Sequence, residues 1–210
     1  MRVSSPSISD SEMLRYRIME FEDRYRKQVL AMACTLVSLV DLRDAYTGGH
    51  SSRVAGYVRS TAVRLGFRDA EVDSVVMAAL LHDIGKIGVP DHVLLKRGSL
   101  TPEDFDHIKK HPELGWMALK NIDDFKSISL IVLHHHERLD GSGYPGGLKG
   151  NEIPLGSRII AVADSYDALT TDRPYRSART RAQAIEELLS FEKSQFDSRV
   201  LAAFLDSMKK

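Results

Sequence analysis

Three apolar segments of the sequence end in ionisable side chains. The run at residues 78–81 leads into His82 and Asp83, the run at residues 128–133 leads into three histidines, and Asp164 follows a third run. Burying a charge costs a great deal of free energy unless the charge is paired or bound to a metal. If the three ends converge in space, they would form a polar pocket that could bind a metal.

The residue types at these ends suit a metal. Histidine nitrogens and carboxylate oxygens bind iron, manganese, zinc or nickel, whereas a structural zinc site of the cysteine type is excluded because Cys34 is the only cysteine. Neighbours such as His82 and Asp83 diverge by about 100° on a helix, so they can address different ions, or one of them can bridge two. Two ions about 3.5–4 Å apart are the usual arrangement for in-line cleavage of a phosphodiester.

Each of these residues also has a simpler interpretation. A single histidine in an apolar helix is more often a hydrogen-bonded core residue than a ligand, and three consecutive histidines could form a solvated turn. All of these residues together indicate a metal site more specifically than any one of them does. His92 and His107 lack a neighbouring carboxylate–histidine pattern, so we expect them to be ordinary surface residues.

The charge balance limits the class of ligand. The chain has 210 residues, and 29 basic residues balance 29 acidic ones, so the formal net charge is zero. A protein that binds a polyanion usually carries a basic excess, so long nucleic acid is not an expected ligand. A small anionic ligand needs only a few local cations and fits this composition.

The apolar stretch at residues 30–40 favours a core helix over a membrane span. It is 11 residues long and contains Thr35 and Ser38, whereas a span needs about 20 apolar residues. Cys34 lies in this stretch, so we expect its thiol to be buried. The N-terminal residues lack the apolar core of a signal peptide, which predicts a cytoplasmic protein.

Helical periodicity extends over almost the whole chain. Apolar residues at spacings of three and four predict one long helix near the N-terminus. Such a stripe is more often core packing, but at this length it could also be the seam of a coiled coil. The stripe consists of Leu14, Ile18, Phe21, Tyr25, Val29, Met32, Leu36 and Val40.

Further helices follow a break at Gly48 and Gly49. Thr101, Thr180 and Asp197 are suited to cap helices. Because no convincing alternating strand pattern and no repeat is present, the predicted fold class is all-α. The other expected helices span residues 50–65, 69–82, 127–136 and 155–169.

Two longer segments carry a resemblance to a known family. Residues 80–91, LLHDIGKIGVPD, resemble the signature of the HD superfamily of metal-dependent phosphohydrolases. Residues 135–176, which include HHE, DGSGYP and AVADSYDALT, resemble the extended signature of its bacterial HD-GYP branch. This resemblance implies a helical bundle with a metal site between helices. It divides the chain into an N-terminal helical extension, residues 1–40, and an HD-GYP domain, residues 41–210.

The resemblance also implies a set of metal ligands. One ion would be held by His50, His82 and Asp164. Asp83 would bridge both ions. His134 does not correspond to a ligand of the family. The second ion would be held by His111, His135 and His136. The implied cofactors are two divalent transition-metal ions, with iron or manganese expected. In some members a Glu four residues before the first ligand binds a third metal, but Tyr46 stands at that position here.

Substrate contacts follow from the same resemblance. Lys86 would contact the scissile phosphate or the attacking hydroxide, although it could instead form a salt bridge with a ligand carboxylate. Arg173 and Arg176 match positions that hold substrate phosphates, and Arg suits bidentate phosphate recognition. Tyr144 of the Gly-Tyr-Pro sequence would contact substrate, or its loop would dock a partner domain.

The implied activity is hydrolysis of cyclic di-GMP to linear pGpG through a metal-bridged hydroxide, with further cleavage to GMP left open. Asp83 and Lys86 would be the catalytic residues. One alternative is a catalytically weak module that acts as a nucleotide sensor or as a docking surface for diguanylate cyclases. Another is the broader HD class that acts on dNTP or ppGpp, against which the DGSGYP segment argues. The long N-terminal stripe further predicts a homodimer.

Overall fold

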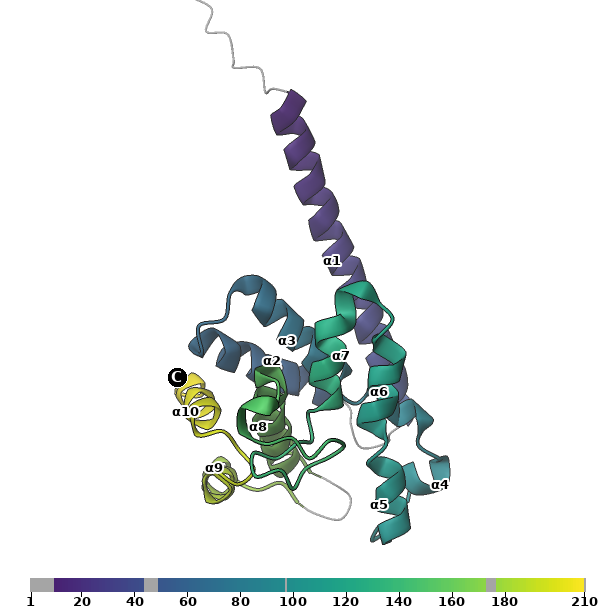
Figure 1. Cartoon of the computed structure of the whole chain (residues 1–210), viewed down its shortest axis with the longest axis vertical. Coiled ribbons are helices and arrows are strands. Elements are labelled where there is room, and N and C mark those ends of the chain that lie inside the picture. Colours follow the sequence, from purple (N-terminus) through teal and green to yellow (C-terminus); the bar gives the residue numbers. More distant parts are fainter. Residues whose placement is uncertain (1–9, 44–48, 97, 173–176, 210) are drawn as a thin grey trace, which may run out of the picture.

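The computed structural model describes residues 10–43, 49–96, 98–172 and 177–209, and Figure 1 shows them as an assembly of helices. Within these ranges there is no β-sheet, only an isolated bridge between Glu192 and Phe196. The all-α prediction is therefore confirmed. The α-helices are α1 (Asp10–Arg43), α2 (His50–Arg64), α3 (Asp69–Leu81), α4 (Asp91–Leu94), α5 (Pro102–Ile108), α6 (His111–Leu119), α7 (Lys126–Leu133), α8 (Leu155–Thr170), α9 (Arg181–Ser190) and α10 (Ser198–Ser207).

Short 3-10 turns connect several of these helices. They are η1 (Ile84–Gly88), η2 (Asp123–Phe125) and η3 (Gly150–Glu152). The expected helix starts are confirmed, because Thr101, Thr180 and Asp197 each accept hydrogen bonds from backbone N–H groups in the first turn. Such caps satisfy donors that have no partner inside the helix.

The core lies where α2, α3, α7, α8 and α10 pack together. Its fully buried side chains include Val54, Leu81, Ile160 and Phe204. Each such burial stabilises the fold by about 1.5–3 kcal/mol. This packing fixes the ends of α3 and α7 and the middle of α8 relative to one another, and these are the places where the ionisable residues lie.

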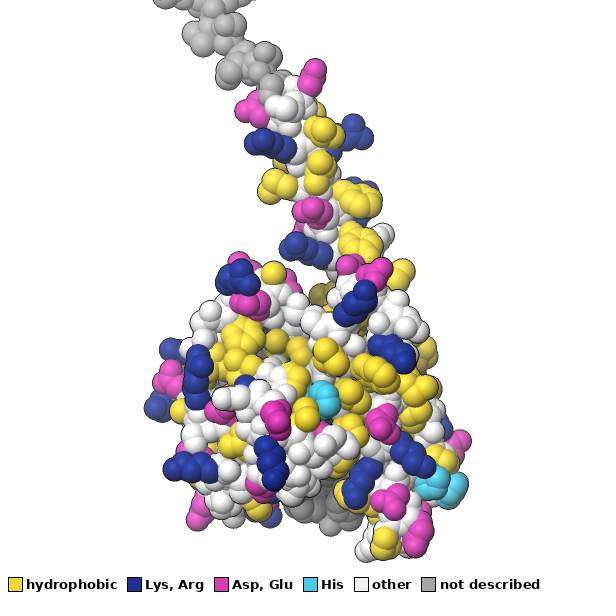
Figure 2. All heavy atoms as spheres, viewed as in Figure 1, with side chains coloured by type: hydrophobic (Ala, Val, Ile, Leu, Met, Phe, Trp, Pro, Cys, Tyr) yellow, Lys and Arg dark blue, Asp and Glu magenta, His cyan; other side chains and the backbone are white. Residues whose placement is uncertain are grey.

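Most of α1 projects away from this core (Figure 1). The expectation that its apolar stripe packs in the core is wrong for most of its length: Phe21 is 70% exposed and Met32 67%, whereas Val40 is buried. Figure 2 shows hydrophobic side chains along the projecting helix. The last part of α1 packs on the core through Ala33, Val37 and Val40, and the Tyr25 hydroxyl donates a hydrogen bond to Asp124 Oδ2 at 3.4 Å.

Arg43, the last residue of α1, is hydrogen-bonded to the turn that follows α3. Arg43 donates from Nη2 to the Val89 carbonyl at 2.7 Å and from Nη1 to the Lys86 carbonyl at 3.2 Å. Cys34 is exposed, so the prediction of a buried thiol is wrong. Its neighbour Ala33 occupies the packed face, and adjacent helical side chains point about 100° apart.

Two helices end earlier than the sequence suggested. α7 ends at Leu133 rather than at residue 136, and α3 ends at Leu81. His135 Nδ1 lies 2.5 Å from the Val132 carbonyl and His82 Nδ1 lies 2.7 Å from that of Ala79. The histidine rings thus satisfy carbonyl groups of the last helical turn, which lack a partner inside the helix.

None of the described helices combines the length and the apolar character that crossing a membrane requires.

Candidate metal centre

The seven ligands expected from the resemblance lie together. His82 and Asp83 follow α3, His135 and His136 follow α7, and the others come from the starts of α2 and α6 and from the middle of α8. Three overlapping groups have ligand atoms within 4.8 Å of one another. These groups are His50–His82–Asp164, His82–Asp83–His135 and His111–His135–His136.

Asp83 lies between the two expected ligand sets. Its Oδ1 is 3.3 Å from His111 Nε2, and its Oδ2 is 3.4 Å from His82 Nε2 and 4.0 Å from His50 Nε2. The two oxygens thus face histidines assigned to different ions, which is the geometry of a bridging carboxylate. Burial opposes ionisation, but nearby Lys86 and His82 outweigh it and hold the pKa of Asp83 well below its usual range.

Three of the histidines are oriented in the same way. The Nδ1 atoms of His82, His111 and His135 lie 2.7, 2.8 and 2.5 Å from backbone carbonyls three residues earlier. A carbonyl accepts only, so Nδ1 carries the proton and Nε2 presents a lone pair to the pocket. This is the arrangement in which a metal-binding histidine is usually held.

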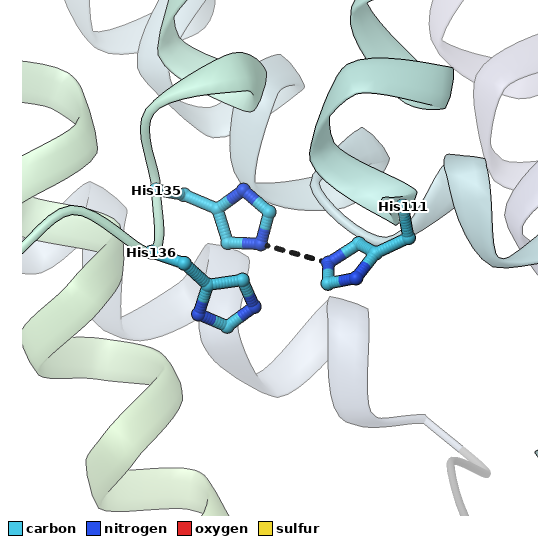
Figure 3. Close-up of side chains that lie close together, drawn as sticks. All are labelled: His111, His135 and His136. Carbon is cyan, nitrogen blue, oxygen red and sulfur yellow. Dashed lines mark hydrogen bonds between the residues drawn. The ribbon is translucent and has the colours of Figure 1, made fainter. Parts of the chain in front are cut away.

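The histidine pocket fits a bound cation. Figure 3 shows His111, His135 and His136 with their rings turned toward one another, and the Nε2 atoms of His111 and His135 are 3.3 Å apart. With both Nδ1 atoms donating to carbonyls, two lone pairs meet there, and an intervening cation would relieve their repulsion. His82 Nε2 is buried without a hydrogen bond to any described residue, which is costly unless a metal takes that place.

Burial also keeps the imidazoles of His135 and His136 neutral, as metal binding requires. It lowers the pKa of His136 to about 3, with a further contribution from His111, and it lowers the pKa of His135 well below its usual value. These rings remain available as ligands at neutral pH without first losing a proton.

His50 has a different environment, because its Nδ1 faces a carboxylate. Asp167 Oδ2 lies 2.7 Å from His50 Nδ1, and Arg53 donates from Nε to Asp167 Oδ1 at 2.7 Å. Burial alone would lower the pKa of His50, but hydrogen bonds to Asp164 and Asp167 raise it to about 10. A divalent ion therefore competes with a proton at His50.

The sequence reasoning missed Asp167. It is almost fully buried and contacts His50 Nδ1, so it would orient His50 if that histidine binds a metal, as partners of this kind do in metal sites. The available signal was its spacing: Asp167 lies three residues after Asp164 on α8, so both carboxylates share a helix face.

Lys86 lies at the edge of the centre. Its Nζ is 2.7 Å from Asp83 Oδ2, so the salt bridge with a ligand carboxylate, weighed as the simpler role, is present. Because the helix ends at Leu81, Lys86 reaches the site from η1 and not from a continued α3. The ammonium group still faces the ligand that both ions would share.

Gly85 allows this turn to approach α6. A Cβ atom at Gly85 would lie 1.9 Å from the His111 carbonyl oxygen and 2.5 Å from the Gly115 nitrogen. The absence of a side chain therefore lets His111 reach Asp83.

Replacement of Gly85 by alanine should destabilise the protein by at least about 2 kcal/mol, because backbone atoms must move to admit the methyl group. Metal content should fall as well, since His111 moves with α6. Gly56→Ala is the control, because no described atom outside its own stretch of helix lies within 4 Å of its Cβ position and alanine is favoured in a helix. Thermal unfolding and elemental analysis measure both effects. Equal stability and metal content in the two variants would contradict the role given to Gly85.

The Gly-Tyr-Pro sequence belongs to a loop, residues 140–149, that folds back on the histidines. Glu137 is buried and accepts hydrogen bonds from the backbone N–H groups of Gly146, at 2.6 Å, and Leu148, at 3.2 Å. A Cβ atom at Gly143 would lie 2.6 Å from the His136 carbonyl oxygen. We call this segment the GYP loop; the sequence reasoning did not identify Glu137, which holds it.

The GYP loop places Tyr144 against His136, one of the expected ligands. Its ring stacks on that of His136 with centroids 4.9 Å apart and an interplanar angle of 28°. Burial, followed by the carboxylates of Asp164 and Asp83, raises the pKa of the Tyr144 phenol above its usual value. The phenol therefore stays protonated and can donate a hydrogen bond.

The remaining sequence candidates fall into two groups. His92 and His107 are exposed, as expected, and His134 lies beside Glu137 at 3.4 Å and belongs to none of the described ligand groups. Arg173 and Arg176, and Tyr46 as well, lie outside the described residues. Their assigned roles remain predictions.

The sequence profile described as HD domain matches residues 35–200. This chain belongs to the HD domain family. HD-domain phosphohydrolases are metal-dependent, and the histidine and aspartate groups described above could hold metal. The family match and several curated relatives at about 40% identity support the predicted resemblance to HD-GYP proteins.

Three curated relatives illustrate the similarity. The chain is 40% identical over 188 residues to a cyclic di-GMP phosphodiesterase of Thermotoga maritima, covering 89% of this chain and 51% of the relative. It is 40% identical over 205 residues to the cyclic di-GMP phosphodiesterase response regulator RpfG of Xanthomonas campestris, covering 97% and 53%. It is 44% identical over 140 residues to the 3'3'-cGAMP-specific phosphodiesterase 3 of Vibrio cholerae, covering 67% and 30%. The chain thus spans about half of their length or less.

Solved structures share the fold. Bd1817, a HDG"Y"P protein from Bdellovibrio bacteriovorus, superposes with a TM-score of 0.64 at 24% identity, covering 77% of this chain and 52% of that chain. The PgpH HD domain of Listeria monocytogenes, solved in complex with cyclic-di-AMP, gives a TM-score of 0.61 at 20% identity, covering 82% and 92%. At these identities the likeness extends to the fold alone.

Proposed function

We propose that this chain is a metal-dependent phosphodiesterase that hydrolyses the cyclic dinucleotide cyclic di-GMP to linear pGpG. The observation that carries the proposal is the position of Asp83, whose two carboxylate oxygens face histidines of both ligand sets. The names of two relatives, from Thermotoga maritima and Xanthomonas campestris, support this substrate. Further cleavage of pGpG to GMP stays open.

We assign a separate role in the reaction to each group of candidate residues. Two divalent ions held by the seven ligands would supply Lewis-acid stabilisation and an activated water. Lys86, whose ammonium lies 2.7 Å from Asp83 Oδ2, would stabilise negative charge on the scissile phosphate, a contribution worth about 10²–10³ in rate for a comparable donor. Arg173 and Arg176 would hold substrate phosphates, and the Tyr144 phenol would donate a hydrogen bond to substrate.

Product separation tests the proposal. Purified protein is incubated with cyclic di-GMP and Mn²⁺ or Fe²⁺, and linear pGpG is expected as the product. A mixed guanine–adenine ring is offered in competition, because relatives from Vibrio cholerae are named 3'3'-cGAMP-specific. Equal or better cleavage of the mixed ring would reject the substrate preference, and no cleavage of either ring would reject the reaction.

Metal content is a separate prediction. We expect two transition-metal ions per chain, iron or manganese, because the ligands form two sets around Asp83 and Tyr46 stands where a third ion would need a carboxylate. Elemental analysis of anaerobically purified protein measures the ratio. Three ions, or none, would contradict the prediction.

A second candidate is a docking module. The GYP loop could bind a diguanylate cyclase domain while the site stays catalytically weak. Loss of ligands would favour that alternative, but all seven are present and clustered, which favours the enzyme. The domain boundary between residues 40 and 41 and the cytoplasmic location also remain predictions.

The exposed stripe of α1 predicts a homodimer. Its large apolar side chains include Leu14, 60% exposed, and Phe21, 70% exposed. A helical seam of this kind is normally covered by a second helix. Phe21→Glu should reduce the mass measured by light scattering from two chains to one, whereas Glu20→Lys, also on the exposed part of α1, should not. An unchanged mass for Phe21→Glu would mean that the stripe is not required for assembly.

A further inference from the structure

A cavity of about 320 Å³ opens beside the metal centre. Its lining includes the expected ligands His136 and Asp164 and the stacked Tyr144. It also includes Phe105 and Lys109, which are not among the expected site residues. The last two come from the end of α5, just before His111 begins α6. The cavity therefore continues from the ligands to a second wall made by α5.

The ammonium group of Lys109 is placed near two aromatic rings of this cavity. Its Nζ lies 4.8 Å from the centroid of Phe105 and 6.0 Å from that of Tyr144. These rings belong to different segments, because Phe105 is on α5 and Tyr144 is in the GYP loop. A cation near ring faces is attracted to them by the ring quadrupole, so the rings help to hold the ammonium at the cavity.

Lys109 remains able to bind an anion. The carboxylate that faces it, Asp106, lies 3.8 Å away with a side chain that is 72% exposed, and such exposed pairs contribute little. Another cation lining the cavity, Arg138, donates to Gln195 Oε1 at 2.5 Å and lies over the Phe191 ring.

Phe105 offers a stacking face. Phe105 is 44% exposed and lines the cavity, although a large aromatic ring gains more free energy when it is covered. Nucleobases stack on such rings, typically with 1–3 kcal/mol per base. An aromatic ring with a lysine beside a phosphodiester-cleaving centre thus matches one nucleotide unit: a base and a phosphate.

We propose that Phe105 and Lys109 form a subsite for the half of the cyclic dinucleotide that is not cleaved. Lys109 binds the second, non-scissile phosphate, and Phe105 stacks on the attached base. The inference rests on the proposed function and deepens it, because it explains how a ring with two phosphates would be distinguished from a simple phosphodiester. Neither residue touches the reacting atoms, so both act on substrate affinity.

The test compares two substrates of the full chain loaded with Mn²⁺. Cyclic di-GMP carries the second nucleotide, whereas bis(p-nitrophenyl) phosphate has one phosphate and no base. Phe105→Leu and Lys109→Gln should each raise KM for cyclic di-GMP about 10-fold, with kcat changed less than about 2-fold. The kinetics of bis(p-nitrophenyl) phosphate, the metal content and the melting temperature should stay unchanged.

Lys120→Gln is the matched control. Lys120 also lies over an aromatic ring four residues earlier, with Nζ 4.1 Å from the Trp116 centroid, but it does not line this cavity. Salt separates the two contributions: raising NaCl from about 0.05 to about 0.5 M should shrink the effect of Lys109→Gln and leave that of Phe105→Leu. Phe105→Tyr, which keeps the ring face, should restore the KM for cyclic di-GMP.

The outcomes distinguish the two proposals. Wild-type cleavage of cyclic di-GMP with unchanged KM in both variants would overturn the subsite and leave the function standing. Equal losses on both substrates, or lost metal, would also overturn it, because the residues would then support the metal centre. If the wild type cleaved bis(p-nitrophenyl) phosphate but not cyclic di-GMP, the proposed substrate would be wrong and the subsite would fall with it.

Discussion

Replacement of Asp83 by alanine is expected to abolish hydrolysis, with a loss of more than about 10³-fold in kcat, and to lower the metal content. Asp83 is the carboxylate that both ions would share, and its oxygens lie 3.3 Å from His111 and 3.4 Å from His82. Its removal takes away the carboxylate whose two oxygens face histidines of both ligand sets. Turnover of cyclic di-GMP and elemental analysis measure the two effects.

The control for this variant is Asp123→Ala. Asp123 forms a salt bridge with the lysine three residues later, as Asp83 does, but its side chain is 90% exposed. Removing a carboxylate there should leave turnover and metals unchanged. If Asp83→Ala kept both ions and its activity, the assignment of Asp83 as the bridging ligand would be wrong.

Replacement of Lys86 by alanine should lower kcat by about 10²-fold while both ions stay bound. The ammonium lies 2.7 Å from Asp83 Oδ2 and therefore close to where a scissile phosphate would meet the ions. Its removal takes away a positive charge but no ligand. Measuring the activity and the metal content of the same metal-loaded sample separates a loss of catalysis from a loss of metal.

Lys126→Ala is the matched control for Lys86→Ala, because Lys126 pairs at 2.8 Å with the exposed Asp123. Lys86→Arg should recover part of the activity, since it restores a cation near the phosphate. Loss of metal in Lys86→Ala would show that the lysine supports the ligand geometry through Asp83 and has no separate role at the phosphate.

Much of the metal centre could be predicted from the sequence. Burying ionisable residues at the ends of apolar runs costs free energy unless they are paired or bound to a metal. His82, Asp83 and Asp164 lie at such ends. The family resemblance added His50 and His111, whose surroundings in the sequence give little sign of their role. The helical class followed from periodicity because apolar spacing is a local property.

The N-terminal helix shows the limit of that reasoning. Periodicity identified α1 and its stripe, but the same spacing suits a core helix and a coiled-coil seam. Whether other helices cover the stripe depends on where α1 lies, and Leu14 and Phe21 are exposed because that part of α1 projects from the core. Cys34 is exposed for another reason: it lies in the part of α1 that packs, but its neighbour Ala33 occupies the packed face.

The sequence by itself determined the helical class, the candidate ligands and the family. Tertiary structure decided which atoms face one another: Asp167 on His50 Nδ1, Gly85 beneath the His111 carbonyl, and Lys109 between the rings of two distant segments. Except for the contact of Lys109 with Phe105, which are four residues apart, these relations join residues far apart in the chain, and each depends on atomic positions to within a few tenths of an ångström. Local periodicity does not encode such distances, because they arise only when the helices pack.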